Sequence, residues 1–99
     1  MKEDAEEIVM EFNNVAASIF ASFFEQFSNS ARKLDRGTDE NVFQMQIAKY
    51  VSMIRSRLEQ QAQKYFTNYS GTKLKELQSA ISARIAYYLQ EFRSKCYSL

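Results

Sequence analysis

The sequence of 99 residues contains no proline, no histidine and no tryptophan, and it has only two glycines and one cysteine. A β-domain of this length would need many turns built from glycine, proline and asparagine, so their scarcity argues against a β-fold. Because proline interrupts helices, its absence permits long unbroken ones. The two glycines, Gly37 and Gly71, mark the places where we expect such helices to be separated.

The missing histidines and the lone Cys96 also restrict the chemistry open to this chain. Histidine is the most frequent general base and a common metal ligand. One cysteine without histidine cannot form an internal disulfide or a zinc site of the usual kind. Neither glycine belongs to a phosphate-binding loop. We therefore predict that the protein is not an enzyme and has no catalytic, cofactor-binding or metal-binding residues and no cofactor.

The charges balance overall but are unevenly distributed along the chain. The net charge is +1, which gives no overall preference for nucleic acid or membranes. Residues 1–31 carry one lysine and six acidic residues, a net charge of −5, whereas residues 72–99 carry five basic and two acidic residues, a net charge of +3. Glu3, Glu7 and Glu11 are spaced like paired carboxylates, but we interpret them as a solvated first part of a helix, where the dipole favours negative charge.

Two features bear on location. The acidic start of the chain differs from a secretory signal, which needs positive charge followed by an apolar run. The longest weakly apolar stretch, Val15 to Phe24, is about half as long as a membrane-spanning helix. Cys96 falls on an apolar stripe and is interpreted as a small buried side chain rather than a redox or lipid-bearing thiol. We expect a cytoplasmic protein with no transmembrane segment.

Apolar side chains recur at intervals of three and four residues in three blocks, which is typical of amphipathic helices. We predict helices over about residues 4–34, 40–68 and 73–95, within a single domain spanning 1–99. Short connections make consecutive helices antiparallel. The predicted fold class is therefore all-α, an antiparallel up-down-up three-helix bundle of long helices, and a four-helix variant results if the first helix breaks near Asn29.

The predicted helix ends have recognisable signals. Arg32 and Lys33 are placed in the last turn of the first helix, where cations are favoured. Gly37 suits the left-handed residue just past a helix end. Thr38 or Asp39 then serves as the cap of the second helix.

Aromatic residues are concentrated in the first helix, where five of the eight phenylalanines lie between positions 12 and 27. Two interpretations remain open: these rings fill a thick core, or Phe20 and Phe24 reach the surface as a patch for a partner or for self-association. Further apolar residues fall off the predicted core stripes. The candidate protein interface comprises Phe20, Phe24, Met45, Met53, Phe66 and Tyr87.

The second and third helices also carry many basic residues, among them Lys49, Arg55, Lys64 and Arg84, with tyrosines between them. Such cations could contact phosphates while tyrosine rings stack on bases. Against this, most of the tyrosines lie on core stripes and the acidic first helix cancels the charge. A nucleic-acid-binding regulator that uses the basic faces of helices 2 and 3 is the alternative function.

Two segments resemble a known family, the small helical immunity proteins that protect lactic acid bacteria from their own pediocin-like bacteriocins, such as enterocin A. Residues 51–58, VSMIRSRL, resemble a stretch of that family in which an aliphatic pair precedes Ser-Arg and another apolar residue. Residues 73–79, KLKELQS, resemble the start of a later helix there. The resemblance implies an all-helical cytoplasmic protein that binds a membrane receptor–bacteriocin complex and has no catalytic activity.

Together these observations favour a non-enzymatic helical module that binds another protein, as an adaptor, inhibitor or immunity-type protein. The aromatic excess of the first helix adds the expectation that the chain self-associates, with a homodimer as one form. The identity of the partner does not follow from the sequence.

Overall fold

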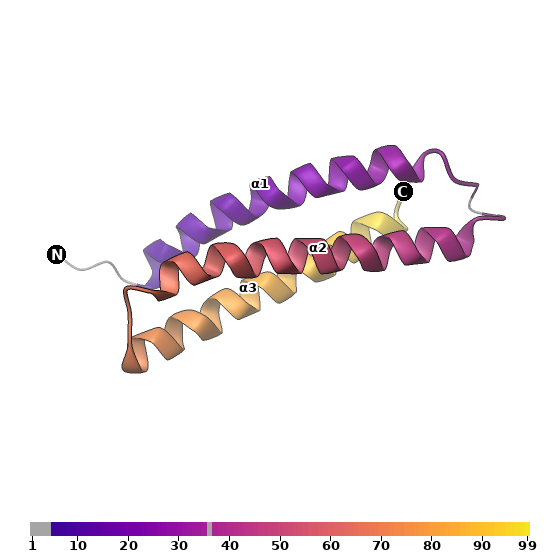
Figure 1. The fold of residues 1–99 in the computed structure, drawn as a ribbon. Coiled ribbons are helices and arrows are strands. Elements are labelled where there is room, and N and C mark those ends of the chain that lie inside the picture. Colours follow the sequence, from indigo (N-terminus) through magenta and orange to yellow (C-terminus); the bar gives the residue numbers. More distant parts are fainter. Residues whose placement is uncertain (1–4, 36) are drawn as a thin grey trace.

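A computed structural model of the chain describes residues 5–35 and 37–99, which form three helices. They are α1 (Ala5–Ala31), α2 (Glu40–Phe66) and α3 (Gly71–Tyr97), each of 27 residues. The helices lie side by side and alternate in direction, and each packs against both of the others (Figure 1). The described residues contain no strand. The prediction of an all-α, up-down-up three-helix bundle of long helices is confirmed.

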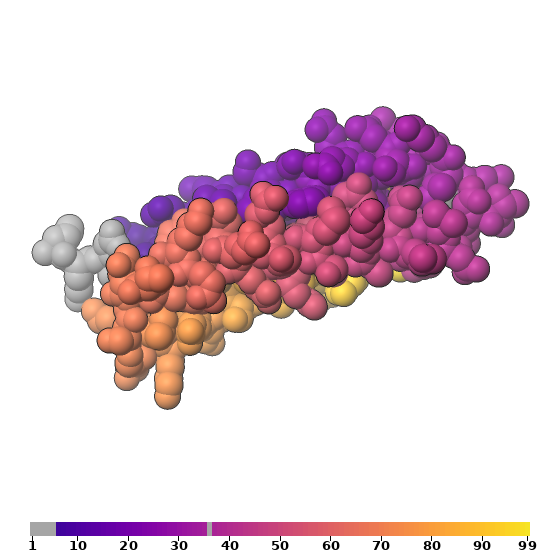
Figure 2. Space-filling model, in the orientation of Figure 1, coloured from indigo at the N-terminus to yellow at the C-terminus, as the bar shows by residue number. Residues whose placement is uncertain are grey.

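The helices make an elongated molecule whose principal dimensions are 56 × 19 × 17 Å. The space-filling view shows the same rod-like outline (Figure 2). This shape follows from helix length, because 27 residues at about 1.5 Å each span roughly 40 Å. The seams between neighbouring helices therefore run along the long axis of the molecule.

The end of α1 differs from the prediction. The helix stops at Ala31, so Arg32 and Lys33 lie in the turn that follows and no basic residue stands in its last turn. The chain leaves the helix through tighter bonds, with the Lys33 amide donating to the Ser30 carbonyl at 3.2 Å and the Leu34 amide to the Ala31 carbonyl at 3.0 Å. The prediction that Arg32 and Lys33 lie in the last turn of the helix, where the dipole favours cations, is therefore wrong. The four-helix variant is also wrong, because α1 is continuous through Asn29.

Hydrogen bonds to two aspartate side chains hold the first turn together. Gly37 does not cap the end of α1 as predicted. Gly37 lies six residues beyond Ala31, and its amide donates to Oδ1 of Asp35 at 2.9 Å. Asp39 occupies the N-cap position of α2, as predicted, but its side chain makes no capping bond. Instead its Oδ2 accepts a hydrogen bond from the Asp35 amide at 3.0 Å. The two carboxylates therefore stabilise the turn rather than the helix start.

The second turn has the predicted length of four residues but lies two residues earlier in the chain than predicted. Helix α2 ends at Phe66 and α3 begins at Gly71, so the chain reverses direction over four residues. Ser70 is extended, and Gly71 has a φ of +65°, in the left-handed region that favours glycine. Glycine at this position therefore allows the chain to enter α3 immediately after the turn. At its other end α3 continues to Tyr97, so Cys96 is part of the helix.

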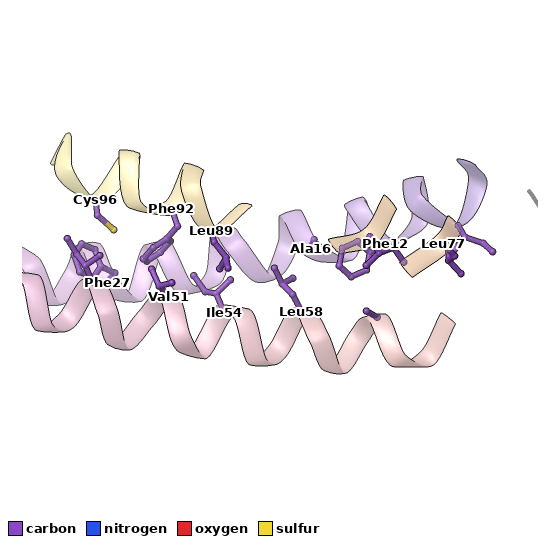
Figure 3. Close-up of a cluster of buried hydrophobic side chains, with 14 of the residues drawn as sticks. Phe12, Ala16, Phe27, Val51, Ile54, Leu58, Leu77, Leu89, Phe92 and Cys96 are labelled. Carbon is purple, nitrogen blue, oxygen red and sulfur yellow. The ribbon is translucent and has the colours of Figure 1, made fainter. Parts of the chain in front are cut away.

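The core runs along the axis between the three helices (Figure 3). In the close-up, Phe92 and Leu89 of α3 point toward Val51 and Ile54 of α2, and Cys96 lies next to Phe27 of α1. Burial of one large apolar side chain contributes about 1.5–3 kcal/mol. The largest fully buried side chains are Phe12, Phe27, Phe43, Phe92, Ile54, Leu58, Leu77 and Ile81.

Aromatic rings fill the two seams that α1 forms with its neighbours. The Phe27 ring lies 5.6 Å from those of Phe43 and Tyr50 on α2 and 5.7 Å from that of Phe92 on α3. Edge-to-face contacts at such distances are favourable beyond the area that they bury. The phenylalanines of α1 thus contribute to a thick core, and the seam between α2 and α3 is the one with fewer large rings.

Candidate protein-binding surfaces

A groove with a volume of about 730 Å³ lies between α2 and α3. Three of its lining residues, Ala62, Ile81 and Leu89, are buried and form the floor, while eight of the thirteen are exposed. It is therefore an open groove rather than an enclosed cavity. The lining residues are Arg55, Glu59, Ala62, Gln63, Phe66, Gln78, Ile81, Ser82, Ile85, Ala86, Leu89, Gln90 and Arg93.

The groove is open because short side chains face it from both helices. Ala62 lies on the α2 side, and Ser82 and Ala86, one helical turn apart, lie on the α3 side. The aliphatic side chains of Ile81, Ile85 and Leu89 remain between them. Because Ile81 and Leu89 are buried, the accessible apolar surface of the groove belongs to the half-buried Ile85 and Phe66 and to the exposed Ala86.

The rim of the groove is polar and has a basic end. Arg55 is the first lining residue of α2 and Arg93 the last of α3. Because the two helices are antiparallel, these arginines stand at the same end. Glu59 lies one turn further along α2, and glutamines supply most of the remaining rim. Two guanidinium groups and one carboxylate leave this end of the groove positive.

A second surface lies on the seam between α1 and α3, where aromatic rings and cations alternate. Phe20 and Phe24 of α1 stack on each other with ring centroids 6.3 Å apart. The Lys95 ammonium lies 5.7 Å from each of the two ring centroids, within the range of a cation–π interaction. Both rings also contact the buried Phe92, at 5.9 Å. They are therefore half-buried, with one side in the core and the other at the surface.

The same seam continues toward Tyr87, whose side chain is 48% exposed. The Arg84 guanidinium carbon lies 4.7 Å from the Tyr87 ring centroid and 5.6 Å from that of Tyr88. Arg84 Nε donates to Oδ1 of Asn13 at 2.8 Å, and the Tyr88 hydroxyl donates to the Asn13 carbonyl at 3.3 Å. Asn13 of α1 thus holds this cluster of α3 in place.

The six residues of the predicted interface do not form one patch. Phe20, Phe24 and Tyr87 share the α1·α3 seam, because the Tyr88 ring contacts both Phe20 at 5.9 Å and Tyr87 at 5.4 Å. Phe66 lies instead in the α2·α3 groove.

The two predicted methionines lie elsewhere on α2. Met45 is 71% exposed and belongs to neither surface. Met53 is half-buried and follows Tyr50 by three residues, which places it on the side of α2 that faces α1, since Tyr50 contacts Phe23 and Phe27.

The α2·α3 groove was not predicted from the sequence. One signal was available: Ser82 and Ala86 interrupt α3 with short side chains one turn apart, beside the aliphatic stripe. Their significance depends on Ala62 standing across from them on α2. The spacing of residues within one helix does not show which residues of the neighbouring helix lie across from them.

Groups able to carry out chemistry are sparse on the described surface. Cys96 is fully buried, and burial raises the pKa of its thiol to about 12, which keeps it in the unreactive protonated form. Within residues 5–35 and 37–99 no cluster of three or more histidine, cysteine, aspartate or glutamate side chains could hold a metal ion.

The tyrosines of the alternative nucleic-acid surface are placed mainly against the core. Tyr65, Tyr69 and Tyr88 are half-buried and pack against core side chains. The pKa of Tyr65 is raised by burial and, to a smaller extent, by the negative charge of Glu11. The Tyr88 ring already contacts Arg84 and Phe20. Stacking platforms for bases would need rings with a freer face than these.

In the comparisons with known proteins, no family model matches the chain, and no curated protein and no solved structure matches it. The fold and its surfaces are thus the basis for a functional proposal. No helix among the described residues combines the length and apolar character needed to cross a membrane.

Proposed function

We propose that this protein is a non-enzymatic helical module that binds another protein, as an adaptor, inhibitor or immunity-type protein would. The observation that carries the proposal is the α2·α3 groove, which combines an aliphatic floor with a polar rim. Specific protein interfaces have this anatomy, an apolar centre surrounded by polar groups. Small-molecule sites, in contrast, enclose most of the ligand surface, which a groove with eight exposed lining residues does not do.

Site-specific photocrosslinking in the native cell tests this proposal. A photoreactive phenylalanine analogue is placed at Ser82 in the groove, at Tyr87 on the α1·α3 seam, and at Gln60, which is exposed and lines neither surface. We expect protein adducts from Ser82 or Tyr87 and none from Gln60. The absence of protein adducts at all three positions would contradict the proposal.

A second function, self-association, is favoured by a different observation. The half-buried Phe20 and Phe24 and the exposed Tyr87 place aromatic surface along one seam, flanked by Arg84 and Lys95. Aromatic and arginine side chains are enriched at the centres of protein interfaces. A homodimer formed through this seam leaves the α2·α3 groove available for a partner.

The resemblance to bacteriocin immunity proteins supplies one candidate setting for such a module. In that case the chain would protect a bacterium by binding a receptor–bacteriocin complex rather than by any reaction. Expression in a sensitive strain tests this idea directly. An unchanged killing curve across a panel of pediocin-like bacteriocins would reject it, while the broader proposal of protein binding would stand.

A further inference from the structure

We infer that the α2·α3 groove receives one amphipathic helix of a partner protein, with small and aliphatic side chains on its floor and a carboxylate-bearing end between Arg55 and Arg93. The inference rests on the proposed protein-binding function and adds to it a site, an occupant and an orientation. In this arrangement the partner helix is the fourth helix of the bundle.

The dimensions of the groove fit a helix of moderate length. Along α3 its lining runs from Gln78 to Arg93, which is roughly 22 Å at about 1.5 Å per residue. A partner helix of about 15 residues spans this distance. Packed helices approach to 8–10 Å between axes when the side chains at the contact permit it. The short side chains of Ala62, Ser82 and Ala86 permit that approach along the middle of the groove.

The nature of the groove walls favours a helix over an extended segment. Both walls are helices, whose backbone donors and acceptors are used within α2 and α3. Recognition of an extended peptide by strand addition needs the free edge of a sheet, which this part of the described structure does not provide. A helix satisfies its own backbone and needs only an apolar surface to dock on. The half-buried Ile85 and Phe66 and the exposed Ala86 provide that surface, above the buried Ile81 and Leu89.

The charges of the rim give the partner helix a direction. Arg55 and Arg93 concentrate positive charge at one end, with Glu59 a turn away from Arg55 as the only carboxylate in the described lining. The lining residues at the opposite end, Phe66 and Gln78, are uncharged. Acidic side chains near the C-terminus of the partner helix, together with its dipole, complement the basic end. We therefore expect the C-terminal end of the partner helix at Arg55 and Arg93.

A designed peptide provides the probe for this inference. It is a fluorescein-labelled 16-residue helix with an alanine and leucine stripe and two glutamates in its last turn, and the matched peptide carries lysines in place of the glutamates. We expect the full-length protein to bind the glutamate peptide at least tenfold more tightly by fluorescence anisotropy. The double variant Arg55→Glu/Arg93→Glu should reverse that preference. The matched variant Lys49→Glu, an exposed change on α2 outside the groove, should not.

Steric blocking provides the second arm of the test. Ser82→Trp fills the groove and should abolish peptide binding, whereas Ser52→Trp, exposed on α2 and outside the groove, should leave it unchanged. Circular dichroism checks that both variants stay folded. Equal binding of the two peptides, or binding that survives Ser82→Trp, would overturn the inference. So would a dimer in sedimentation that Ser82→Trp converts to monomer, because a second copy would then occupy the groove.

The protein-binding function and the groove inference can be contradicted by different results. If photocrosslinks to a protein other than a second copy of the chain form at Tyr87 but not at Ser82, and neither peptide binds, the protein-binding function stands and the groove inference is wrong. If no position yields a protein adduct and neither peptide binds, both are wrong.

Discussion

Phe92 is the residue on which the aromatic core converges. Its ring, fully buried, lies 5.7–6.4 Å from the rings of Phe20, Phe24, Phe27 and Tyr50, which come from both other helices. Removing it leaves a cavity at the centre of the bundle and deletes four ring contacts. Phe92 therefore joins the α1·α3 seam to the aromatic core.

We expect Phe92→Ala to lower the free energy of unfolding by about 3–5 kcal/mol, the usual cost of truncating a buried phenylalanine. Urea denaturation followed by circular dichroism measures the loss. Tyr87→Ala is the matched control, since Tyr87 is an aromatic residue of the same helix that is half exposed. Its loss should stay below about 1 kcal/mol. A larger loss for Tyr87→Ala than for Phe92→Ala would contradict the described packing.

The thiol of Cys96 offers a second test at the residue scale. Burial raises its pKa to about 12, so at pH 8 the folded protein holds almost no thiolate at this position. Because the thiolate is the nucleophile, alkylation by iodoacetamide should require unfolding. We expect native Cys96 to react at least about 100-fold more slowly at pH 8 than the same thiol in 6 M urea, as measured by mass spectrometry. Fast labelling of the folded chain would show that α3 frays at its end.

The same pKa shift makes stability depend on alkaline pH. In the folded state the thiol keeps its proton up to about pH 12, whereas the ordinary value is 9.0. Between these values the unfolded state loses the proton first, so stability is complete below about pH 9 and declines as the pH rises toward 12. The raised pKa of Tyr65 acts in the same direction. Cys96→Ala should flatten the decline between pH 9 and 10 in urea titrations. An unchanged slope would rule out the thiol as its source.

At the scale of the element, Gly71 determines how α3 begins. Its φ of +65° is unfavourable for residues with a side chain, although no atom lies within 4 Å of where a Cβ would stand. The cost of substitution therefore comes from the backbone alone. We expect Gly71→Ala to destabilise the protein by about 1–2 kcal/mol and Gly71→Asn by less, since asparagine tolerates this region better.

Gly37 provides the comparison for this prediction. A Cβ added there would meet Oδ1 of Asp35 at 3.3 Å, and that side chain is exposed and able to shift. Urea denaturation of Gly37→Ala should therefore show a smaller loss than that of Gly71→Ala. Equal losses would indicate that the two turns impose the same backbone constraint.

Most of the fold could be predicted from the sequence because burial has a helical period. Phe12, Phe27, Ile54 and Leu58 stand on the predicted stripes and are fully buried. The ends of the helices could be predicted less well. Arg32 suits the last turn of a helix by its charge, but local bonds between Ser30 and Lys33 tighten the chain before that turn is complete.

The binding surfaces could be predicted only in part, for a different reason. Phe20, Phe24 and Tyr87 were identified from their positions off or beside the core stripes, and they share one seam. The groove between Ala62 and Ala86 required knowing which outer residues of α2 and α3 face one another. That pairing depends on the rotation of each helix within the bundle, which the spacing within a single helix does not determine.

At the scale of the whole molecule, the rod shape separates the two surfaces. The radius of gyration is 16.0 Å, compared with about 13 Å for a compact chain of this length. The α1·α3 seam and the α2·α3 groove share α3 but open on different sides of it: Arg84 and Tyr88 bond to α1, whereas Ser82 and Ala86 face α2. The proposed self-association and the proposed partner binding would therefore use different surfaces of one molecule.

Tyr87 is the residue at which self-association through the α1·α3 seam can be tested. Symmetric pairing of two copies would bury Tyr87 of each, and loss of an interface tyrosine commonly weakens association at least tenfold. Changing Phe20 or Phe24 would also damage the core, because both rings contact Phe92. Tyr87→Asp, with half of its side chain exposed, is the cleaner variant. We expect it to raise the dissociation constant of the dimer at least tenfold in sedimentation equilibrium.

Met45→Asp is the matched control, because Met45 is the most exposed of the predicted interface residues and lies outside the seam. It should leave the dissociation constant unchanged. If Met45→Asp dissociates the dimer and Tyr87→Asp does not, the outer face of α2 is the interface instead. The wild-type chain could instead sediment as a monomer up to several hundred micromolar, which means that the free energy of association is weaker than about −5 kcal/mol. The seam would then have no role in self-association. The half-exposed rings of Phe20 and Phe24 would then serve the core alone.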